Sequence, residues 1–204
     1  MKYKHLMLDL ETMSNKSNAA IVSIGAVAFE PSTGELGPAF YLIVDLRSCE
    51  RAGLHIDADT VLWWMKKSSE ARAAIVAEGS DLSLALSNLG AFSREVLTDD
   101  VQVWGNGVDF DNVILRNAYN AIGLDPFWKH WNNRCVRTIV ELGRNAGIDP
   151  KTTLPFVGEP HNALDDAIHQ AKYVSIIHQH LTKPVNDDIL IFKSVCGRCG
   201  DNYV

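Results

Sequence analysis

Two carboxylates interrupt an otherwise apolar segment near the start of the chain, residues 4–13 (KHLMLDLETM). Apolar runs of this length are typical of a buried strand, in which successive side chains point to opposite faces. Asp9 and Glu11 therefore share one face, and the three leucines of the segment share the other. Burying two neighbouring negative charges is costly unless a positive charge lies between them, and Mg²⁺ prefers carboxylate oxygens. The segment indicates a metal site; the alternative is that Glu11 ends the strand and Asp9 caps a turn.

The rest of the chain alternates strand-like and helix-like patterns. We expect further strands at residues 20–30, 39–45, 101–104 and 189–195, and helices at residues 57–78, 82–97, 110–122, 136–145 and 162–181. Short turns between the first three strands predict an antiparallel meander. The order predicts an α/β fold with a mixed central sheet flanked by helices. We expect one catalytic domain over residues 1–184, with a strand and a cysteine-containing tail, residues 185–204, packed on it.

Composition narrows the class of protein. A length of 204 residues suits one domain, and a hydrophobic fraction of 47% with 22% charged residues is typical of a globular protein. No apolar run approaches the roughly 18 residues that cross a bilayer, so no membrane contact is expected. The four cysteines do not predict a disulfide scaffold, which favours a cytoplasmic location. The net charge of −6 argues against a basic, sequence-independent nucleic-acid binder, but it is compatible with an enzyme that holds nucleotides through metal ions.

A second pair of acidic residues lies where the strand at residues 101–104 ends. The sequence WGNGVDFDN places Asp109 and Asp111 after a glycine-containing turn, at the start of a helix. Sites in open α/β sheets form at the carboxyl ends of strands. Asp109 fits the position of a helix N-cap. Asp111 is the stronger candidate for a metal ligand, with Asp109 as its competitor.

The third acidic motif opens the longest predicted helix, in the sequence PHNALDDA. Asn162 and Asp165 have the spacing of a capping box, which leaves Asp166 available to a site. His161 lies on the loop just before this helix. Because histidine titrates near neutrality, His161 beside a metal cluster is a candidate general base; the alternative is a surface histidine.

These three motifs, in this order, resemble those of the DEDDh (DnaQ-like) 3′→5′ exonucleases, which have the ribonuclease-H-like fold. The resemblance covers residues 6–181, and its phrases WGNGVDFDNVIL and PHNALDDA are most similar to small stand-alone exoribonuclease-like proteins of bacteria and phages. It implies a bacterial or phage-encoded enzyme that releases nucleoside monophosphates. It also implies two divalent ions, Mg²⁺ or Mn²⁺, about 4 Å apart around the scissile phosphate. The implied ligands are Asp9, Glu11, Asp111 and Asp166, with His161 as the general base.

Substrate contacts are less defined by the sequence. Thr12 and Met13 stand near the place where many relatives have glycine, and we expect their backbone to contact the terminal nucleotide. Asn106 is a further expected contact, although the turn carries one more residue before Asp111 than the usual form. Trp63 and Trp64 diverge by about 100° on a helix, so one ring faces the core; we expect Trp64 to stack on a base.

The expected substrates are single-stranded 3′ ends or overhangs, with RNA favoured and DNA also open. The alternatives are an endonuclease of the ribonuclease H type and a catalytically silent nucleic-acid-binding scaffold. A homodimer through the strand at residues 189–195 is expected. Cys196 and Cys199 resemble half of a zinc site, but a four-ligand site needs a second pair, so a tail with free thiols is the default.

Overall fold

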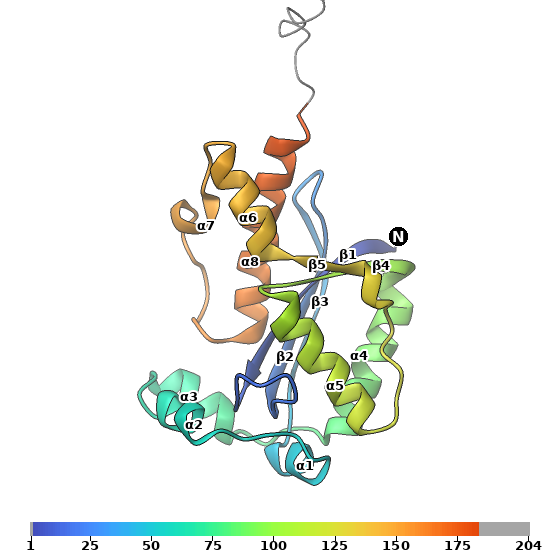
Figure 1. Ribbon diagram of the computed structural model, residues 1–204, viewed down its shortest axis with the longest axis vertical. Coiled ribbons are helices and arrows are strands. Elements are labelled where there is room, and N and C mark those ends of the chain that lie inside the picture. The colour runs from blue at the N-terminus through green and yellow to red at the C-terminus, as the bar shows by residue number, and fades with distance from the viewer. Residues whose placement is uncertain (1, 184–204) are drawn as a thin grey trace, which may run out of the picture.

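The computed structural model describes residues 2–183 of the chain, and its centre is a five-stranded mixed sheet (Figure 1). The strand order is β3-β2-β1-β4-β5. Strands β1, β2 and β3 form the predicted antiparallel meander, whereas β4 and β5 extend the sheet in parallel on the other side of β1. The strands are β1 (Tyr3–Thr12), β2 (Ile21–Glu30), β3 (Glu35–Ile43), β4 (Leu97–Gly105) and β5 (Asn133–Cys135).

The two faces of the sheet carry separate hydrophobic layers. The three leucines of β1 pack with helices α4 (Leu82–Val96) and α5 (Val113–Ala121). Met7 faces the other way, toward α6 (Val136–Asn145) and α8 (Ala163–Leu181). Figure 1 shows the two helix pairs on opposite sides of the sheet. The predicted alternation of β1 is confirmed, and it places Asp9 and Glu11 on the face that α8 covers.

The predicted helix at residues 57–78 is wrong as one element. The structure has α2 (Ala58–Trp64) and α3 (Ser69–Val76), which are separated by a break at residues 65–68. Ser68 caps α3, because its side chain accepts a hydrogen bond from the backbone N–H of Ala71. The residues of the break are not helix breakers, since none of them is glycine or proline, which explains why the pattern predicts a single helix.

Other elements refine the predicted bounds. Helix α6 matches its prediction, and the predicted helix at residues 110–122 begins with a π-helical turn, η1 (Val108–Asn112), before α5. Four short elements were not predicted: α1 (Leu46–Arg51), the 3₁₀ turn η2 (His130–Asn132), β5 and α7 (Pro150–Thr153).

Several predictions fall outside the described residues. These are the strand at residues 189–195, the dimer contact expected there, and the cysteine pair Cys196 and Cys199. Within residues 2–183, no helix is long and apolar enough to cross a membrane.

Candidate active site

A glycine on the sheet allows helix α8 to begin close to the carboxylates of β1. Gly25 of β2 pairs with Asp9 of β1. A Cβ atom at Gly25 would overlap the backbone of Ala163 and Leu164, the first residues of α8. The missing side chain therefore lets the first turn of α8 rest on the sheet, and this contact brings Asp166 to the carboxylates of β1.

Asp111 lies where β1 and β4 separate. The pairing of these parallel strands ends at Met7 and Trp104, and the carboxylate of Asp111 bridges the gap beyond. Its Oδ1 accepts from the backbone N–H of Leu10 at 3.2 Å and its Oδ2 accepts from that of Asn106 at 2.9 Å. Only 2% of Asp111 is exposed.

Asp109, the competing candidate, is exposed on η1. It does not cap this helix, because the cap position is Gly107 and no side chain makes a capping bond there. Of the two aspartates, the geometry therefore brings Asp111 to the carboxylates of β1.

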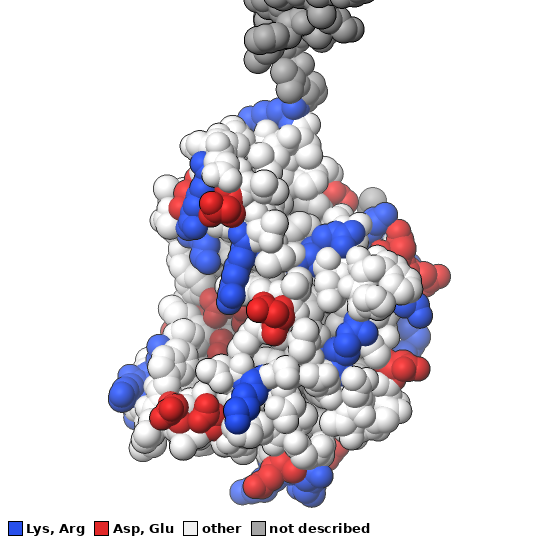
Figure 2. All heavy atoms as spheres, viewed as in Figure 1, with Lys and Arg blue, Asp and Glu red and all other residues white. Residues whose placement is uncertain are grey.

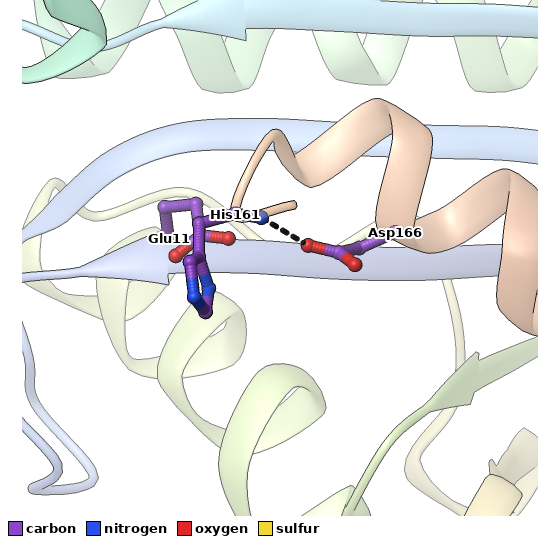
Figure 3. A group of neighbouring side chains, drawn as sticks. All are labelled: Glu11, His161 and Asp166. Carbon is purple, nitrogen blue, oxygen red and sulfur yellow. Dashed lines mark hydrogen bonds between the residues drawn. The ribbon is translucent and has the colours of Figure 1, made fainter. Parts of the chain in front are cut away.

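The remaining candidates come together from β1 and the start of α8 (Figure 3). Oxygen atoms of Glu11 and Asp166 and a ring nitrogen of His161 all lie within 4.8 Å of one another. Asp166 Oδ2 accepts from the backbone N–H of His161 at 3.0 Å. Asp9 Oδ1 accepts from Gln170 Nε2 at 2.7 Å, one helical turn beyond Asp166 on α8.

His161 has a left-handed backbone conformation, with φ of 68°. This conformation is uncommon for a residue other than glycine. It directs the backbone N–H to Asp166 while the imidazole ring lies beside Glu11, as Figure 3 shows. Burial and the nearby Lys67 lower the pKa of His161, so that the ring is neutral near pH 7.

The cluster carries more negative charge than its surroundings offset. Burial, reinforced by the neighbouring carboxylates, raises the pKa of Asp9 well above its usual value and that of Glu11 to about 8. Burial also raises the pKa of Asp111 to about 7, against the opposing effect of its backbone hydrogen bonds, and raises that of Asp166. Clustered oxygen donors that lack compensating charge fit hard divalent cations such as Mg²⁺ or Mn²⁺.

Two adjoining cavities meet at the cluster. The carboxylate cavity, of about 320 Å³, is lined by the four carboxylates together with Asn106, Arg137, His161 and Gln170. The tryptophan cavity, of about 430 Å³, is lined by Thr12, Asp57, Trp63 and Trp64 among others. Leu10, Glu11 and Phe110 line both cavities. Figure 2 shows acidic side chains in a recess of this face and basic side chains on the surrounding surface.

The two tryptophans have different environments. Trp64 is only 3% exposed, and its Nε1 donates to the carbonyl of Thr12 at 2.9 Å. Trp63 is 41% exposed, its ring centroid lies 5.1 Å from that of His161, and Lys67 Nζ lies 3.7 Å from the Trp63 centroid. Both tryptophans line the cavity, but Trp63 presents the more accessible ring and the nearly buried Trp64 forms the wall. Stacking of a base on Trp64 stays a prediction.

The other expected substrate contacts differ in the same way. Thr12 lines the tryptophan cavity, whereas Met13 is buried and its backbone is already paired: its N–H donates to Ala20 and its carbonyl accepts from Asp57. The N–H of Met13 is thus occupied, and Met13 lines neither cavity, so its contact with a nucleotide stays a prediction. Asn106 lines the carboxylate cavity, and its buried Oδ1 has no partner among the described residues.

The sequence patterns do not point to Gln170 or to a role for the side chain of Phe110. They offer Trp63 only as an alternative to Trp64 for stacking, and Arg137 only as one of several basic residues that could contact a phosphate. Gln170 had a usable signal, because it follows Asp166 by four residues and so lies on the same face of α8. For Trp63 the missing information is the rotation of α2 relative to the sheet, which the local sequence does not specify.

Comparison with known proteins agrees with this geometry. The 3′-5′ exoribonuclease Rv2179c-like domain matches residues 4–178. An exodeoxyribonuclease of Enterobacteria phage T4 is 26% identical over 162 residues, which cover 66% of this chain and 70% of the phage protein.

Solved structures show the same fold. The nuclease domain of 3′hExo, a DEDDh family member bound to rAMP, has a TM-score of 0.60 at 14% identity, over 87% of this chain and 92% of that one. E. coli exonuclease I in an ssDNA complex has a TM-score of 0.62 at 16% identity, over 87% of this chain but 40% of that one. Because the family match extends over most of the chain, the protein belongs to the Rv2179c-like 3′-5′ exoribonuclease domains and is a 3′-5′ exonuclease.

Proposed function

We propose that the protein shortens single-stranded 3′ ends or overhangs of nucleic acid, with RNA favoured over DNA, and releases nucleoside monophosphates. The observation that carries this proposal is the convergence of Asp9, Glu11, Asp111 and Asp166 in one cavity. Their pKa values are raised, and no cationic side chain of residues 2–183 is sufficient to offset them. These side chains would hold two divalent ions, Mg²⁺ or Mn²⁺. When bound, such ions polarise a phosphoryl oxygen and lower the pKa of a bound water.

His161 is proposed as the general base. Its ring lies beside Glu11 at the edge of the cluster, and its lowered pKa keeps a nitrogen lone pair available at neutral pH. It accepts the proton of the water that attacks the phosphorus atom in line with the departing 3′ oxygen. The hydrogen bond from the backbone N–H of His161 to Asp166 fixes the backbone that carries the imidazole. The start of helix α8 therefore positions His161 and Asp166 together.

The terminal nucleoside is proposed to occupy the tryptophan cavity. The exposed ring of Trp63 offers a stacking surface for an unpaired base, which favours single-stranded ends. The preference for RNA follows the description of the family, whereas the phage relative is an exodeoxyribonuclease, so DNA is proposed as a second substrate. An endonuclease and a silent scaffold are the alternatives, and His161 together with a complete set of carboxylates argues against both.

Three further proposals concern the whole chain. Residues 1–184 are proposed to form the catalytic domain, with residues 185–204 as its extension. A cytoplasmic site of action in a bacterium, or in a phage-infected bacterium, remains a prediction. The homodimer is also still a prediction, and the similar proteins give it no support.

The test is a time course on 5′-labelled RNA and DNA oligonucleotides, single- and double-stranded, with Mg²⁺, Mn²⁺ or EDTA. We expect a ladder that shortens from the 3′ end and disappears with EDTA. His161→Asn should lower the rate by about 10²- to 10⁴-fold, because asparagine tolerates the left-handed backbone but is no base. His180→Asn, away from both cavities, is the control. Internal cuts would indicate an endonuclease, and no cleavage of any substrate would support the scaffold.

A further inference from the structure

Arg137 is the only Lys or Arg among the residues that line the carboxylate cavity. It is exposed on the first turn of α6, and its guanidinium packs against Gly107. A Cβ atom at Gly107 would lie 3.0 Å from Asp109 Oδ1, 3.1 Å from Arg137 Cζ and 3.3 Å from Arg137 Nη1. Gly107 has φ of 127°, a conformation that favours glycine, so the turn after β4 leaves room for this guanidinium at the wall of the cavity.

Arg137 lies near two acidic residues but is not fixed by either: its charge lowers the pKa of Asp111, and Asp109 also lies beside Gly107. Within residues 2–183, its guanidinium makes no hydrogen bond to a side chain or carbonyl and no ion pair within 4.0 Å. It occupies the first turn of α6, where the helix dipole disfavours a positive charge, and no acidic residue offsets it in that turn. Its donors are thus available to a ligand that enters the cavity.

The arrangement of the cavities suggests which ligand group this is. Arg137 lines the carboxylate cavity but not the tryptophan cavity, and the two cavities meet at Leu10, Glu11 and Phe110. With the terminal nucleoside in the tryptophan cavity, the scissile phosphate lies at the carboxylates. The next phosphate of the strand then passes the wall formed by Arg137. A guanidinium matches two oxygens of a phosphate group, which a lysine does not.

We propose that Arg137 binds the second phosphate from the 3′ end, immediately 5′ of the scissile one, and so helps to set the register of the strand. This assignment rests on the proposed function, which places the terminal nucleoside in the tryptophan cavity and the scissile phosphate at the carboxylates. It makes Arg137 a substrate-binding residue of the cavity that also holds the catalytic carboxylates.

The experiment is a double-mutant cycle. The charge of one phosphate is removed from the RNA and the guanidinium of Arg137 is removed from the protein, first separately and then in the same complex. A single-stranded 10-nucleotide RNA carries a neutral methylphosphonate at the first, second or fifth linkage from its 3′ end. Its Kd is measured by fluorescence anisotropy with Ca²⁺ in place of Mg²⁺. For the wild type, we expect the second-linkage change to weaken binding about 10-fold, the scale of one charge-assisted contact. Arg137→Gln should bind the unmodified strand about 10-fold more weakly and lose nothing further at the second linkage.

Two variants complete the design. Arg137→Lys should recover part of the affinity, because it restores the charge without the paired donors. Arg144→Gln is the matched control: Arg144 is on the same helix but pairs with Asp149 at 2.9 Å, so this variant should keep the wild-type pattern. Thermal melting of both glutamine variants checks that each is folded.

The outcomes separate cleanly. If Arg137→Gln still loses a further 10-fold at the second linkage, or if the coupling appears at the first or fifth linkage, the assignment is overturned. Because binding is measured without turnover, a strand that binds but is not shortened with Mg²⁺ would contradict the proposed function, while the coupling still decides the role of Arg137.

Discussion

The two walls of the active site are built in different ways. The carboxylate wall comes from β1, η1 and α8, and backbone N–H groups or a buried amide hold its oxygens, as for Asp111 and Asp9. The tryptophan wall comes from the short helix α2 and the turn after it. Trp63, on α2, is half-exposed and contacts His161 and Lys67. Ser68 Oγ donates to Glu159 Oε1 at 3.2 Å, the one side-chain hydrogen bond from this turn to the loop that carries His161.

This difference indicates which wall serves catalysis and which serves recognition of the base. Chemistry needs donors held within a fraction of an ångström, so it lies on the packed sheet and on the start of a long helix. Recognition of a base needs a surface that tolerates any base, and a half-exposed ring supplies it. Changes on the carboxylate wall should therefore affect turnover, and changes on the tryptophan wall should affect binding.

The largest expected effect is from Asp111→Asn. Losing one charged ligand should remove several kcal/mol of transition-state stabilisation, a fall in kcat of about 10³-fold or more. Asp109→Asn, two residues away and exposed, is the matched control and should stay within about twofold, as surface substitutions do. Both are measured by single-turnover cleavage. A larger loss for Asp109→Asn than for Asp111→Asn would reverse the assignment.

Next in size is Gly25→Ala, which tests whether the sheet positions α8. The added methyl group overlaps the backbone of Ala163 and Leu164, so the first turn of α8 must shift away from Asp9. We expect kcat to fall by about 10²-fold and stability to fall by about 1–3 kcal/mol. Gly90→Ala, in the interior of α4, should instead be neutral or slightly stabilising. Full activity of Gly25→Ala would show that α8 is placed by other contacts.

The neighbouring tryptophans give a third comparison. Trp63→Ala should raise KM about 10-fold with kcat nearly unchanged, because one base loses its stacking partner. Trp64→Ala should lower the free energy of unfolding by about 3–5 kcal/mol, as expected for a buried ring. Leu62→Ala, exposed on the same helix, is the control for both. Steady-state kinetics and denaturant unfolding distinguish these results, and an equal KM for Trp63→Ala and wild type would remove Trp63 from the substrate site.

The smallest expected effect concerns pH. The folded pKa values of Glu11, about 8, and Asp111, about 7, exceed their unfolded values. The metal-free protein is therefore stabilised by protonation of these groups, and this contribution is lost as the pH rises from about 4 to 8. Mn²⁺ competes with those protons, so the increase in Tm that it causes should be a few degrees larger at pH 8 than at pH 6. A pH-independent increase would place the ion elsewhere.

The parts of the fold that the sequence predicts correctly are those with local periodic signals. The alternation of β1 and the amphipathic pattern of α6 are examples, and the carboxylate wall follows from the same local spacing. Strand β5 has only three residues, too few for a periodic signal. The break between α2 and α3 depends on the cap at Ser68 rather than on hydrophobicity.

The tryptophan wall depends on contacts between residues far apart in the sequence, and local sequence patterns do not predict such contacts. Trp64 is fixed by a hydrogen bond to Thr12, 52 residues earlier, and Met13 is paired with Asp57. Neither partner is visible from local spacing. Gly25 reads as an ordinary small residue of a strand, and its importance appears only when α8 is seen to rest on it.

The central claim is that Asp9, Glu11, Asp111 and Asp166 together hold the metal ions of the reaction. The most direct test is an anomalous-difference map from crystals soaked with Mn²⁺ and a nucleoside monophosphate. We expect Mn²⁺ peaks bounded by these four side chains, with the nucleoside in the tryptophan cavity and loss of the peaks in Asp9→Asn crystals. Peaks at other residues in an enzyme that degrades its substrate would contradict the account.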